Sequence, residues 1–422
     1  MREDDRHGLR SGRPRPLGSI RMSSRVRRIL VIFAAALLAI GAVLATVFTW
    51  GPVRVSETRV LLDFLLGRGI APPSDATVSE RLRVPPGFRV QVYSSEVPLA
   101  RVIVFTSSGD LLVSRTRNDA VSILDRDRDG DGHADGHRVL LDGLDGPHGL
   151  ALHEGWLYVA ERTRVSRVRF DETSGTVTAP LVPVLAGLTA DGRHQTKTIG
   201  FGPDGWLYLS QGSSCDVCVE EDPRRAAIMR MRPDGSEATI HATGLRNSVG
   251  FDWAPWDGAL FATDNARDLM GDDFPPDELN RIEQDRFYGW PYVHGDGVPD
   301  PQYGAELSGD ARPTSPVHGF RPHNAPLGIH FLRTTDMPSG YERSALVALH
   351  GSWNRSTPDG YKVVALRWNS GGAISESDFL TGFLGPDGII GRPAFVNEGP
   401  DGAIYVSDDY AGVIYRVSAT TP

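Results

Sequence analysis

Residues 202–210 read GPDGWLYLS, a polar turn followed by a short strand of alternating apolar residues, and this stretch decides the fold because the chain repeats it. Five further segments share the pattern: SSGDLLVSR at 107–115, HEGWLYVAE at 153–161, PWDGALFATD at 255–264, SGYERSALVALHG at 339–351 and GPDGAIYVSDD at 399–409. Each segment runs into a second apolar strand, such as AVSILDR, RVSRVRF or GVIYRVS. Self-similarity of this kind predicts a repeat architecture.

The repeated unit is built from short strands rather than helices. Its strands alternate with period two, polar turns join them, and no amphipathic helix separates them, which indicates an all-β protein. Six units of this size fit the four-stranded blades of a propeller, and closing the ring removes exposed strand edges. We therefore predict a six-bladed β-propeller over residues 84–420, with the first strand in PPGFRVQVYSS, near Val84.

The interval between the fourth and fifth repeats is the longest. It holds DLMGDDFPPDELN and FYGWPYVHGDGVPDPQY, which are rich in Pro, Gly and acidic residues. Long ordered insertions on a rigid scaffold usually carry function, so we expect this one to border the functional face. A plain surface excursion is the alternative.

An uncharged apolar run, ILVIFAAALLAIGAVLATVFTW, occupies residues 29–50. In a helix it is long enough to cross a hydrocarbon core of about 30 Å. Nine arginines lie among residues 1–28, and by the positive-inside rule they keep the N-terminus in the cytoplasm. We predict a basic cytoplasmic tail (1–28), a transmembrane anchor or signal segment (29–50), a connector (51–83) and an extracytoplasmic folded domain.

The charge balance excludes one class of partner. The chain has a formal net charge of -9, and its only dense basic run lies before residue 29. The folded part therefore has no electrostatic footprint for nucleic acid.

The acidic run DRDRDGDGHADG at 125–136 is a candidate calcium loop. Asp127, Asp129, Asp131 and Asp135 offer alternating carboxylates, and Gly132 allows the sharp turn that would let them converge on a hard cation. A full EF-hand is absent because Gly136 stands where the bidentate glutamate would be. A solvated acidic hairpin is the alternative.

Cys215 and Cys218 are the only cysteines. Their spacing is compatible with a redox pair, half of a zinc site or a small disulfide loop. Haem attachment would need His in place of Val219, and zinc would need a second ligand pair nearby. In an exported protein we favour a local disulfide that pins a loop.

Polar residues recur at equivalent points of the repeats. His194, Gln195 and Lys197 precede one strand, Arg246 and Asn247 precede another, His350 ends a third, and Arg392 and Asp409 accompany the last repeat. In a propeller the loops that lead into equivalent strands converge at one end of the central channel. These residues are thus predicted to form one ring around an anionic, polar ligand.

Several of these motifs resemble a known superfamily. The segments HQTKTIGFGPDGWLYLSQGSSCDVC, GLRNSVGFDW, ATDNARD, FYGWPYV, LHGSWNRSTPDGYKVV and GPDGAIYVSDDYAG resemble the soluble pyrroloquinoline quinone (PQQ)-dependent sugar dehydrogenases, most closely the sorbosone and pyranose dehydrogenase branch. The resemblance spans about residues 84–418 and keeps the order of the motifs. It implies a six-bladed propeller that binds PQQ and calcium over the channel mouth.

The resemblance also implies roles for individual residues. His194 would be the general base that takes the hydroxyl proton while hydride passes to the quinone, and Arg246 would stabilise negative charge on the quinone oxygen. The backbone carbonyls of Ala266 and Arg267 would hold calcium. The cofactor contacts implied are Gln195, Lys197, Arg246, Asn247, His350, Arg392 and Asp409.

Three positions depart from the glucose-oxidising members. Arg193 stands where they carry Asp, His350 where they place a cofactor-binding Lys, and Ala266-Arg267 where they have Gly-Pro. The last change is tolerable because carbonyls would bind the metal. The first two argue against glucose as the substrate and make Lys362 or Arg355 candidates for the missing cationic contact.

Two other readings stay open at this stage. A calcium-dependent lactonase would need a side-chain metal cage, for which Glu278, Asn265 and Asp264 are candidates. A non-catalytic binding propeller would instead place aromatic or apolar residues at the channel mouth. The dehydrogenase interpretation predicts a sugar or sugar-derived aldehyde as substrate and an external electron acceptor, a membrane quinone or a cytochrome.

Overall fold

The computed structural model describes residues 24–28, 30–33, 35, 38–39, 41, 60, 62–63, 66–334 and 337–420. The chain divides into two compact units, Met1–Pro52 and Val53–Pro422. In the first unit the described residues are helical. No helix within the described part of the chain is long and apolar enough to cross a membrane, and most of the anchor predicted over 29–50 lies outside the described residues.

The second unit contains six sheets, one for each predicted blade, and each has four antiparallel main strands. Ordered from the inside outward, the first blade consists of β2 (Ile103–Phe105), β3 (Leu111–Arg115), β4 (Ala120–Asp125) and β5 (Gly136–Leu141). The second blade consists of β6 (Leu150–His153), β7 (Trp156–Ala160), β8 (Arg164–Asp171) and β10 (Val182–Ala186). The third blade consists of β11 (Lys197–Phe201), β12 (Leu207–Gln211), β13 (Ala227–Met231) and β14 (Thr239–Thr243). The short strands β9 (Thr176–Val177) and β18 (Arg286–Phe287) extend the second and third of these sheets.

The remaining three blades follow the same plan. The fourth blade consists of β15 (Phe251–Trp253), β16 (Leu260–Asp264), β17 (Asp277–Ile282) and β21 (His318–Phe320). The fifth blade consists of β22 (Pro326–Phe331), β23 (Ser344–Leu349), β24 (Lys362–Trp368) and β25 (Ile374–Leu380). The sixth blade consists of β28 (Pro393–Glu398), β29 (Ile404–Asp408), β30 (Val413–Ala419) and β1 (Phe88–Ser94). Outside the blades lie α3 (Asp75–Arg81), the 3-10 turns η1 (Thr116–Asn118) and η2 (Gly304–Glu306), and the hairpins β19 (Val293–His294) with β20 (Val298–Pro299) and β26 (Leu384–Gly385) with β27 (Gly388–Ile389).

The six-bladed propeller predicted from the repeats is thus confirmed. Each of the six repeats forms the second strand of its blade: β3, β7, β12, β16, β23 and β29. These second strands are buried along nearly their whole length, and Leu111, Leu157, Leu209 and Ile404 are fully buried. The repeated sequence pattern therefore indicates strands whose two faces both pack against neighbouring blades.

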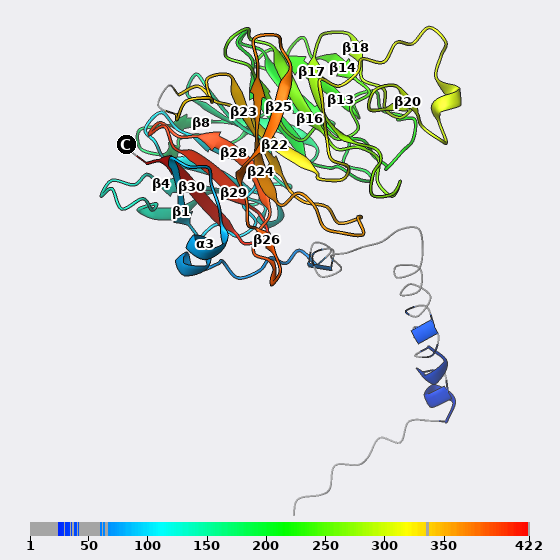
Figure 1. Ribbon diagram of the computed structural model, residues 1–422, viewed down its shortest axis with the longest axis horizontal. Helices are drawn as coiled ribbons and strands as arrows, with labels where there is room; N and C mark the ends of the chain where they lie inside the picture. The colour runs from blue at the N-terminus through cyan, green and yellow to red at the C-terminus, as the bar shows by residue number, and fades with distance from the viewer. Residues whose placement is uncertain are drawn as a thin grey trace, which may run out of the picture. The chain divides into compact units, whose positions relative to one another are not determined.

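The ring is closed by strands from the two ends of the domain. β1 pairs antiparallel with β30, with Val90 opposite Val417 and Val92 opposite Tyr415, so the first strand of the domain is the outermost strand of the last blade (Figure 1). An unpaired outer edge on this blade would expose β30 to other chains. The first strand of the domain therefore completes the sheet of the last blade and closes the ring of blades.

One sequence prediction about the long interval was wrong. DELN was assigned to the insertion, but Asp277–Ile282 is β17, the third strand of the fourth blade. The extra residues therefore form two loops, 265–276 and 283–317, on either side of this strand. The error arose because Asp277, Glu278 and Asn280 are buried polar residues that break the apolar alternation.

The connector predicted over 51–83 contains ordered structure. α3 begins after Ser74, whose side-chain oxygen accepts a hydrogen bond from the Thr77 amide and caps the helix. Val78 and Leu82 are buried in the hydrophobic cluster of the last two blades. The segment before the first strand is therefore packed onto the propeller.

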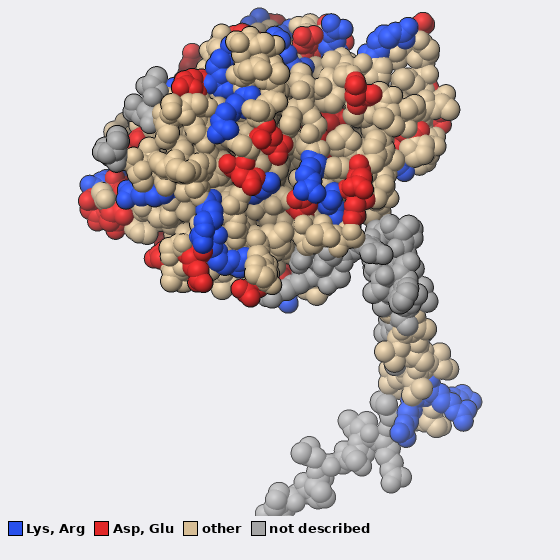
Figure 2. Space-filling model, in the orientation of Figure 1, with Lys and Arg blue, Asp and Glu red and all other residues tan. Residues whose placement is uncertain are grey.

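Charged side chains are interspersed on the face of the molecule seen in Figure 2, where basic and acidic residues lie next to one another. This distribution agrees with the absence of a basic footprint in the sequence of the folded part.

Candidate active site

A cavity of about 650 Å³ opens at one end of the propeller. The loops that lead into innermost strands contribute Arg101, Gly192, Arg193, His194, Gln195, Thr196, Arg246, Asn247, His323, Ala325 and Arg392. The loops that follow second strands contribute Thr116, Arg117, Asn265, Ala266, Asp268, His350, Gly351, Trp353, Asn354, Asp409 and Tyr410. These two sets of loops meet because the second strand of every blade runs antiparallel to the first.

Seven of the residues predicted to form the ring lie on this cavity. They are His194, Gln195, Arg246, Asn247, His350, Arg392 and Asp409. Residues separated by more than 200 positions in the sequence are brought together by equivalent positions in different blades.

His194 is held in one orientation by the loop that follows β12. Its Nδ1 atom lies 3.0 Å from the main-chain oxygen of Ser213 and 2.9 Å from the Ser213 hydroxyl. Since a carbonyl oxygen can only accept, Nδ1 carries the proton and Nε2 is left with its lone pair. Burial, and then Arg246, lower the pKa of His194 well below its ordinary value, so the imidazole is neutral at pH 7.

The backbone around His194 is tightly constrained. His194 has φ of 47°, a left-handed conformation that is costly for a residue with a side chain. Gly212, on the facing loop, leaves room for it, because a Cβ there would lie 2.7 Å from the His194 Cβ and 2.5 Å from the Asn247 Oδ1. A strained residue packed against a glycine is typical of a functional loop.

Two buried basic side chains hold the loop that carries His194 in place. The Lys197 Nζ donates to the carbonyl oxygens of Thr189 (3.1 Å) and Gln195 (2.8 Å), and Lys197 has 0% exposure. Arg225 donates to the carbonyl oxygens of Thr189 and Arg193, at 3.1 Å and 2.7 Å. Burial, and then Arg225, lower the pKa of Lys197 to about 7. Lys197 therefore supports the loop from beneath, and its side chain is not among those that line the cavity.

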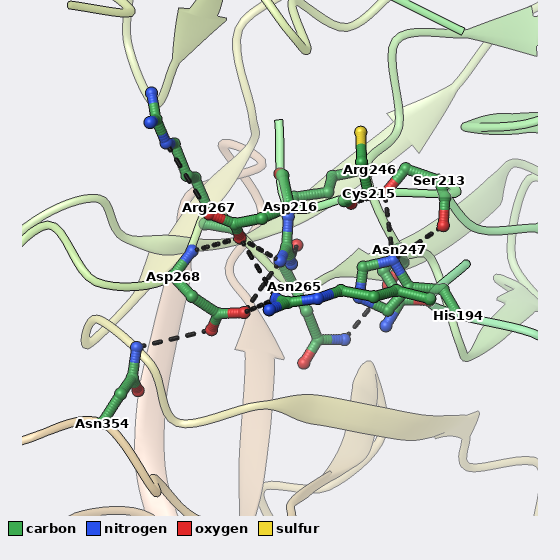
Figure 3. A network of polar contacts seen from close by, with 12 residues as sticks. His194, Ser213, Cys215, Asp216, Arg246, Asn247, Asn265, Arg267, Asp268 and Asn354 are labelled. Carbon is green, nitrogen blue, oxygen red and sulfur yellow. Dashed lines mark hydrogen bonds and ion pairs between the residues drawn. The ribbon is translucent and has the colours of Figure 1, made fainter. Parts of the chain in front are cut away.

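Arg246 is buried at the centre of an acidic network (Figure 3). Its Nη2 contacts Asp216 Oδ1 at 2.7 Å and Asp268 Oδ2 at 2.9 Å, while Nε donates to the Asp216 carbonyl and Nη1 to the Asn265 carbonyl. Four of its five N–H groups are thus used within the protein, and one N–H on Nη1 is left for a ligand.

Arg193, the residue before His194, joins the same network. Its Nη1 lies 3.3 Å from Asp268 Oδ2 and 3.8 Å from Asp216 Oδ1. The side chain is 51% exposed, so this pair is weakened by solvent. Arg193 therefore places a cation at the mouth of the cavity, beside the imidazole.

In two blades, a buried carboxylate fixes the cavity loop by accepting hydrogen bonds from main-chain amides. The Asp264 carboxylate, at the end of β16, accepts hydrogen bonds from the amides of Arg246 and Asn247. The Asp408 carboxylate, at the end of β29, accepts one from the amide of Arg392. In each case the last residue of a second strand anchors the loop that leads into the innermost strand of its own blade.

His350 and Asp409 form a hydrogen-bonded pair on the cavity wall. The His350 Nε2 lies 2.7 Å from Asp409 Oδ1, and the other oxygen of Asp409 lies 2.6 Å from Arg101 Nη1. Burial, and then Arg392, lower the pKa of His350 to about 4, although Asp409 opposes the shift. His350 is therefore neutral and donates from Nε2 to Asp409.

Arg392 is oriented by main-chain oxygens rather than by acids. Its Nε and Nη2 donate to the carbonyls of His350 and Gly351, and its guanidinium lies over the Tyr361 ring. Among the residues that the structure describes, no carboxylate pairs with it, so its charge is available to an anion in the cavity.

The segment after Asn265 presents main-chain oxygens. The Ala266 amide donates to Asp277 Oδ1, whose pKa is raised to about 7 by burial. Within the described part of the chain, the carbonyls of Ala266 and Arg267 accept no hydrogen bond. Free carbonyl oxygens are suitable ligands for a hard cation. The Arg267 side chain itself points elsewhere and pairs with Asp300 at 2.6 Å.

Two predicted cationic contacts are not in the cavity. Lys362 pairs with Asp378 at 2.6 Å between β24 and β25. Arg355 is buried and donates to the carbonyls of Asp272 and Pro322. Neither side chain lines the cavity, so a direct contact from either one to a ligand there is only a sequence prediction.

The metal cage imagined for a lactonase is also not assembled. Asp264 is occupied by main-chain amides, and Glu278 accepts hydrogen bonds from Asn280 and from the Gly295 amide. Of the three candidate ligands, only Asn265 lines the cavity. This arrangement disfavours the lactonase reading.

The two cysteines form a disulfide, which confirms the favoured interpretation. The bridge closes a loop that contains Asp216, a partner of Arg246, and it begins two residues after Ser213, the partner of His194. It therefore pins residues that position the two central groups of the cavity.

The acidic loop lies away from this site. It joins β4 to β5, whereas the loop that joins β3 to β4 carries the cavity residues Thr116 and Arg117, so the two loops lie at opposite ends of the blade. Carboxylate oxygens of Asp127, Asp129 and Asp135 come within 4.8 Å of one another. Asp131 is not in this group, and its Oδ1 accepts from the His133 amide.

Sequence reasoning missed several residues of the site: Arg101, Ser213, Asp216, Arg225, Asp268 and His323. Their positions relative to the strands could have identified them. Ser213, for example, follows the second strand of its blade, as His350 and Asp409 follow the second strands of theirs. The rule that found the strand-leading loops applies equally to the loops after second strands.

Fold and cavity together define a six-bladed propeller with a cavity at one end of the ring. The chain belongs to the family described as a domain of unknown function, DUF7133, whose profile matches residues 74–420. An uncharacterized protein of Borreliella burgdorferi is 37% identical over 215 residues, which cover 50% of this chain and 56% of the relative. The chain thus spans about half the length of that relative.

A further curated relative and several solved structures carry a cofactor in their names. A PQQ-dependent pyranose dehydrogenase of Coprinopsis cinerea is 31% identical over 130 residues, 26% of this chain and 17% of the relative. The holo PQQ domain of pyranose dehydrogenase from Coprinopsis cinerea aligns with a TM-score of 0.68 and 21% identity over 80% of this chain and 97% of that one. A calcium structure of a Trichoderma reesei carbohydrate-active enzyme aligns with a TM-score of 0.69 and 22% identity over 84% and 99%.

The same fold extends to bacterial proteins. The soluble aldose sugar dehydrogenase of Escherichia coli, in its apo form, aligns with a TM-score of 0.60 and 18% identity over 79% of this chain and 100% of that one. At 18 to 22% identity, these likenesses show that the chain shares the fold of these dehydrogenase structures.

Proposed function

We propose that the protein is a PQQ-dependent oxidoreductase that oxidises a sugar or a sugar-derived aldehyde. The observation that carries this proposal is the state of His194, whose Nδ1 is fixed on the Ser213 carbonyl and whose Nε2 is left unprotonated at the cavity. A neutral, oriented imidazole is suited to take a proton from a hydroxyl group. It acts beside cationic groups that favour a bound anion.

The residues around the cavity fit the cofactor. A tricarboxylate needs cations without acidic partners, which Arg392 offers, and hydrogen-bond donors, which Arg246 and Asn247 offer. The free carbonyls of Ala266 and Arg267 would hold calcium. When bound, the quinone supplies the hydride acceptor and calcium polarises it. Gln195 and the His350–Asp409 pair would complete the contacts.

The chain's own residues would handle the proton. The substrate hydroxyl would donate its proton to the His194 Nε2, and the Ser213 carbonyl would stabilise the imidazolium through Nδ1–H. Arg246 keeps one N–H for developing negative charge while Asp216 and Asp268 hold its plane fixed. The low pKa of His194 keeps the base unprotonated at neutral pH.

Arg193 bears on the choice of substrate. It lies beside the base, where the glucose-oxidising relatives would place an acid, and pairs with Asp268. We therefore expect a substrate other than glucose, in the class of pyranoses or sorbosone-like aldehydes. We propose a membrane quinone or a cytochrome as the electron acceptor, since the chain has no haem-attachment motif.

The test is reconstitution of the purified full chain with PQQ and calcium. Dye reduction is followed over a panel of aldoses and sugar aldehydes, and hydrolysis of sugar lactones is measured on the same samples without PQQ. The proposal expects PQQ-dependent dye reduction and no hydrolysis. Lactone hydrolysis in the absence of PQQ, with no dye reduction in its presence, would instead support the lactonase reading.

A further inference from the structure

Part of the long insertion between the fourth and fifth repeats has no role in the proposed function. The hairpin of β19 and β20 lies in the loop 283–317, and none of its described residues lines the cavity. His294 in this hairpin and Asp300, which directly follows it, are buried, with 4% and 3% exposure. A buried carboxylate needs cations or hydrogen-bond donors as partners. The partners of Asp300 therefore show what the hairpin holds.

Asp300 connects the hairpin to the loop 265–276. Its Oδ2 accepts hydrogen bonds from Arg267 Nη1 at 2.6 Å and from His294 Nε2 at 2.8 Å. Its Oδ1 accepts hydrogen bonds from the main-chain amides two and three residues further along, so the carboxylate itself is fixed. The side chains of Arg267 and Asp300 are 16% and 0% exposed, so water screens this ion pair less than a surface pair.

Three successive residues of the loop are each held by a different carboxylate. The amides of Ala266 and Asp268 donate at 2.9 Å to the carboxylates of Asp277 and Asp216, respectively. Arg267, between them, donates no main-chain hydrogen bond within the described part of the chain, and its side chain holds it to the hairpin. The ion pair with the hairpin is therefore the anchor of the middle residue.

This anchoring leaves the carbonyl oxygens of Ala266 and Arg267 available. The two oxygens belong to the peptide groups on either side of the Arg267 Cα, and each peptide group is planar. The orientation of Arg267 therefore sets both oxygens at once, and Figure 3 shows its side chain pointing away from His194. Two carbonyls bind one calcium ion only when both come within about 2.3–2.6 Å of it. A backbone that had to be ordered on binding would lower the affinity.

We propose that Asp300 is a positioning residue for calcium, because through Arg267 it holds the two carbonyls that would bind the ion. The insertion supports the neighbouring anchor as well, since the Trp290 Nε1 donates to the Asp216 carbonyl at 3.4 Å. The insertion thus serves the site from outside the cavity. The inference deepens the proposed function and rests on it for the identity of the ion.

Positioning and charge predict opposite effects for Arg267. A guanidinium close to a divalent cation repels it, so charge alone predicts tighter calcium binding when the guanidinium is removed. Positioning predicts weaker binding, because the two carbonyls lose their anchor. Arg267→Met leaves both ligands chemically unchanged, since they are main-chain oxygens. For Asp300→Asn both effects weaken binding, and for the double variant the two changes of charge cancel.

The experiment uses the full chain in the background Asp127→Asn/Asp135→Asn, which removes two of the clustered carboxylates of the acidic loop. Arg267→Met, Asp300→Asn and the double variant are compared in this background. Calorimetry gives the Kd of calcium without PQQ. A titration with PQQ gives the calcium concentration at which half of the cofactor is bound.

The matched control is the ion pair between Arg416 and Asp401. Its atoms lie 2.7 Å apart, and the Arg416 side chain is 16% exposed, as is that of Arg267. Neither control residue lines the cavity. Arg416→Met and Asp401→Asn therefore report what the loss of a comparable ion pair does to the protein as a whole.

Positioning predicts that both single variants and the double variant raise the Kd of calcium and the half-maximal concentration about tenfold. The double variant is expected to be no worse than the single ones, because all three break the same pair. It also retains no unpaired buried charge, so it keeps the test valid if a single variant does not fold. The controls are expected to leave both values unchanged.

Three results would overturn the inference. The first is a Kd of calcium that falls in Arg267→Met, rises in Asp300→Asn and is unchanged in the double variant, which is the effect of charge alone. The second is a rise in the controls as large as in the Arg267 and Asp300 variants, which is a general loss of stability. The third is a background protein that binds no calcium with or without PQQ.

The outcomes also separate this inference from the proposed function. A protein whose calcium binding depends on Asp300, but which neither binds PQQ nor reduces dye, would uphold the positioning role and overturn the function. PQQ-dependent dye reduction, with the same Kd of calcium in every variant, would uphold the function and overturn the positioning role.

Discussion

The Nδ1 atom of His194 lies 3.0 Å from the main-chain oxygen of Ser213, and this contact decides which nitrogen of the imidazole is available. A side-chain partner could be removed by mutation, but a carbonyl oxygen is a permanent acceptor. The β12 strand and the disulfide loop that follows it place this oxygen. The chemistry proposed for His194 is thus fixed by the backbone of the blade.

The low pKa of His194 predicts the acid limb of the pH profile. Only the unprotonated imidazole accepts a proton, so activity falls as pH drops through the pKa of His194. Burial and Arg246 lower this pKa below 6.5, so the acid-side apparent pKa of kcat/KM is expected below 6.5. The measurement is kcat/KM from pH 4.5 to 8.5 in the reconstituted protein. An acid limb centred at or above 6.5 would contradict the assignment.

Lys197 is predicted to position His194 from below. Lys197→Met keeps the length of the side chain but removes its hydrogen bonds to the carbonyls of Thr189 and Gln195. We expect kcat to fall about tenfold, with the Kd of PQQ changed less than about twofold, because the loop and not the cofactor site is loosened. Lys197→Arg should restore part of kcat.

The matched control for this prediction is Lys362→Met, because Lys362 is the other lysine of the chain and lies outside the cavity. Equal losses of kcat in the two methionine variants, or a loss in Lys197→Met that follows only the melting temperature, would show that Lys197 has no positioning role.

The contrast between these two lysines shows what the sequence could and could not predict. Each repeat shows in its own sequence the alternating pattern of a buried strand. Because this pattern is local, counting the repeats gives the number of blades. Whether a lysine near a strand end points into a cavity or under a loop depends on neighbours such as Thr189 and Arg225, which come from other segments. That information is not in the local pattern.

The disulfide between Cys215 and Cys218 is predicted to contribute more to activity than to the stability of the fold. It closes a very short loop, so the double variant Cys215→Ser/Cys218→Ser should lower the melting temperature by less than about 4 °C. The loop also supplies Asp216, which holds Arg246 through its carbonyl and carboxylate. We expect kcat to fall severalfold. A large drop in melting temperature with unchanged kcat in the folded fraction would reverse this view.

The acidic loop between β4 and β5 is predicted to bind calcium for stability and not for turnover. Its three clustered carboxylates lie at the opposite end of the blade from the cavity loops. In Asp127→Asn/Asp135→Asn we expect a smaller rise of melting temperature on adding calcium than in the wild type, with unchanged kcat at saturating PQQ. An identical calcium-dependent rise in both proteins would exclude a site in this loop.

Strand β17 could not be predicted from the sequence for a different reason. In β17, Asp277 and Glu278 are buried because main-chain amides satisfy them. Such buried polar residues hide a strand from any pattern based on apolar periodicity.

The central claim is that His194 takes a proton while a bound quinone is reduced by sugar. The most direct measurement is a single-turnover experiment without oxygen, in which the PQQ- and calcium-loaded wild type and His194→Gln are mixed with the best aldose of the panel and the absorbance of the bound quinone is followed. We expect rapid reduction in the wild type. In His194→Gln we expect PQQ binding within about threefold of the wild type and reduction slower by roughly 10²- to 10⁴-fold. Equal rates of reduction in the two proteins would contradict the role of His194 as the base.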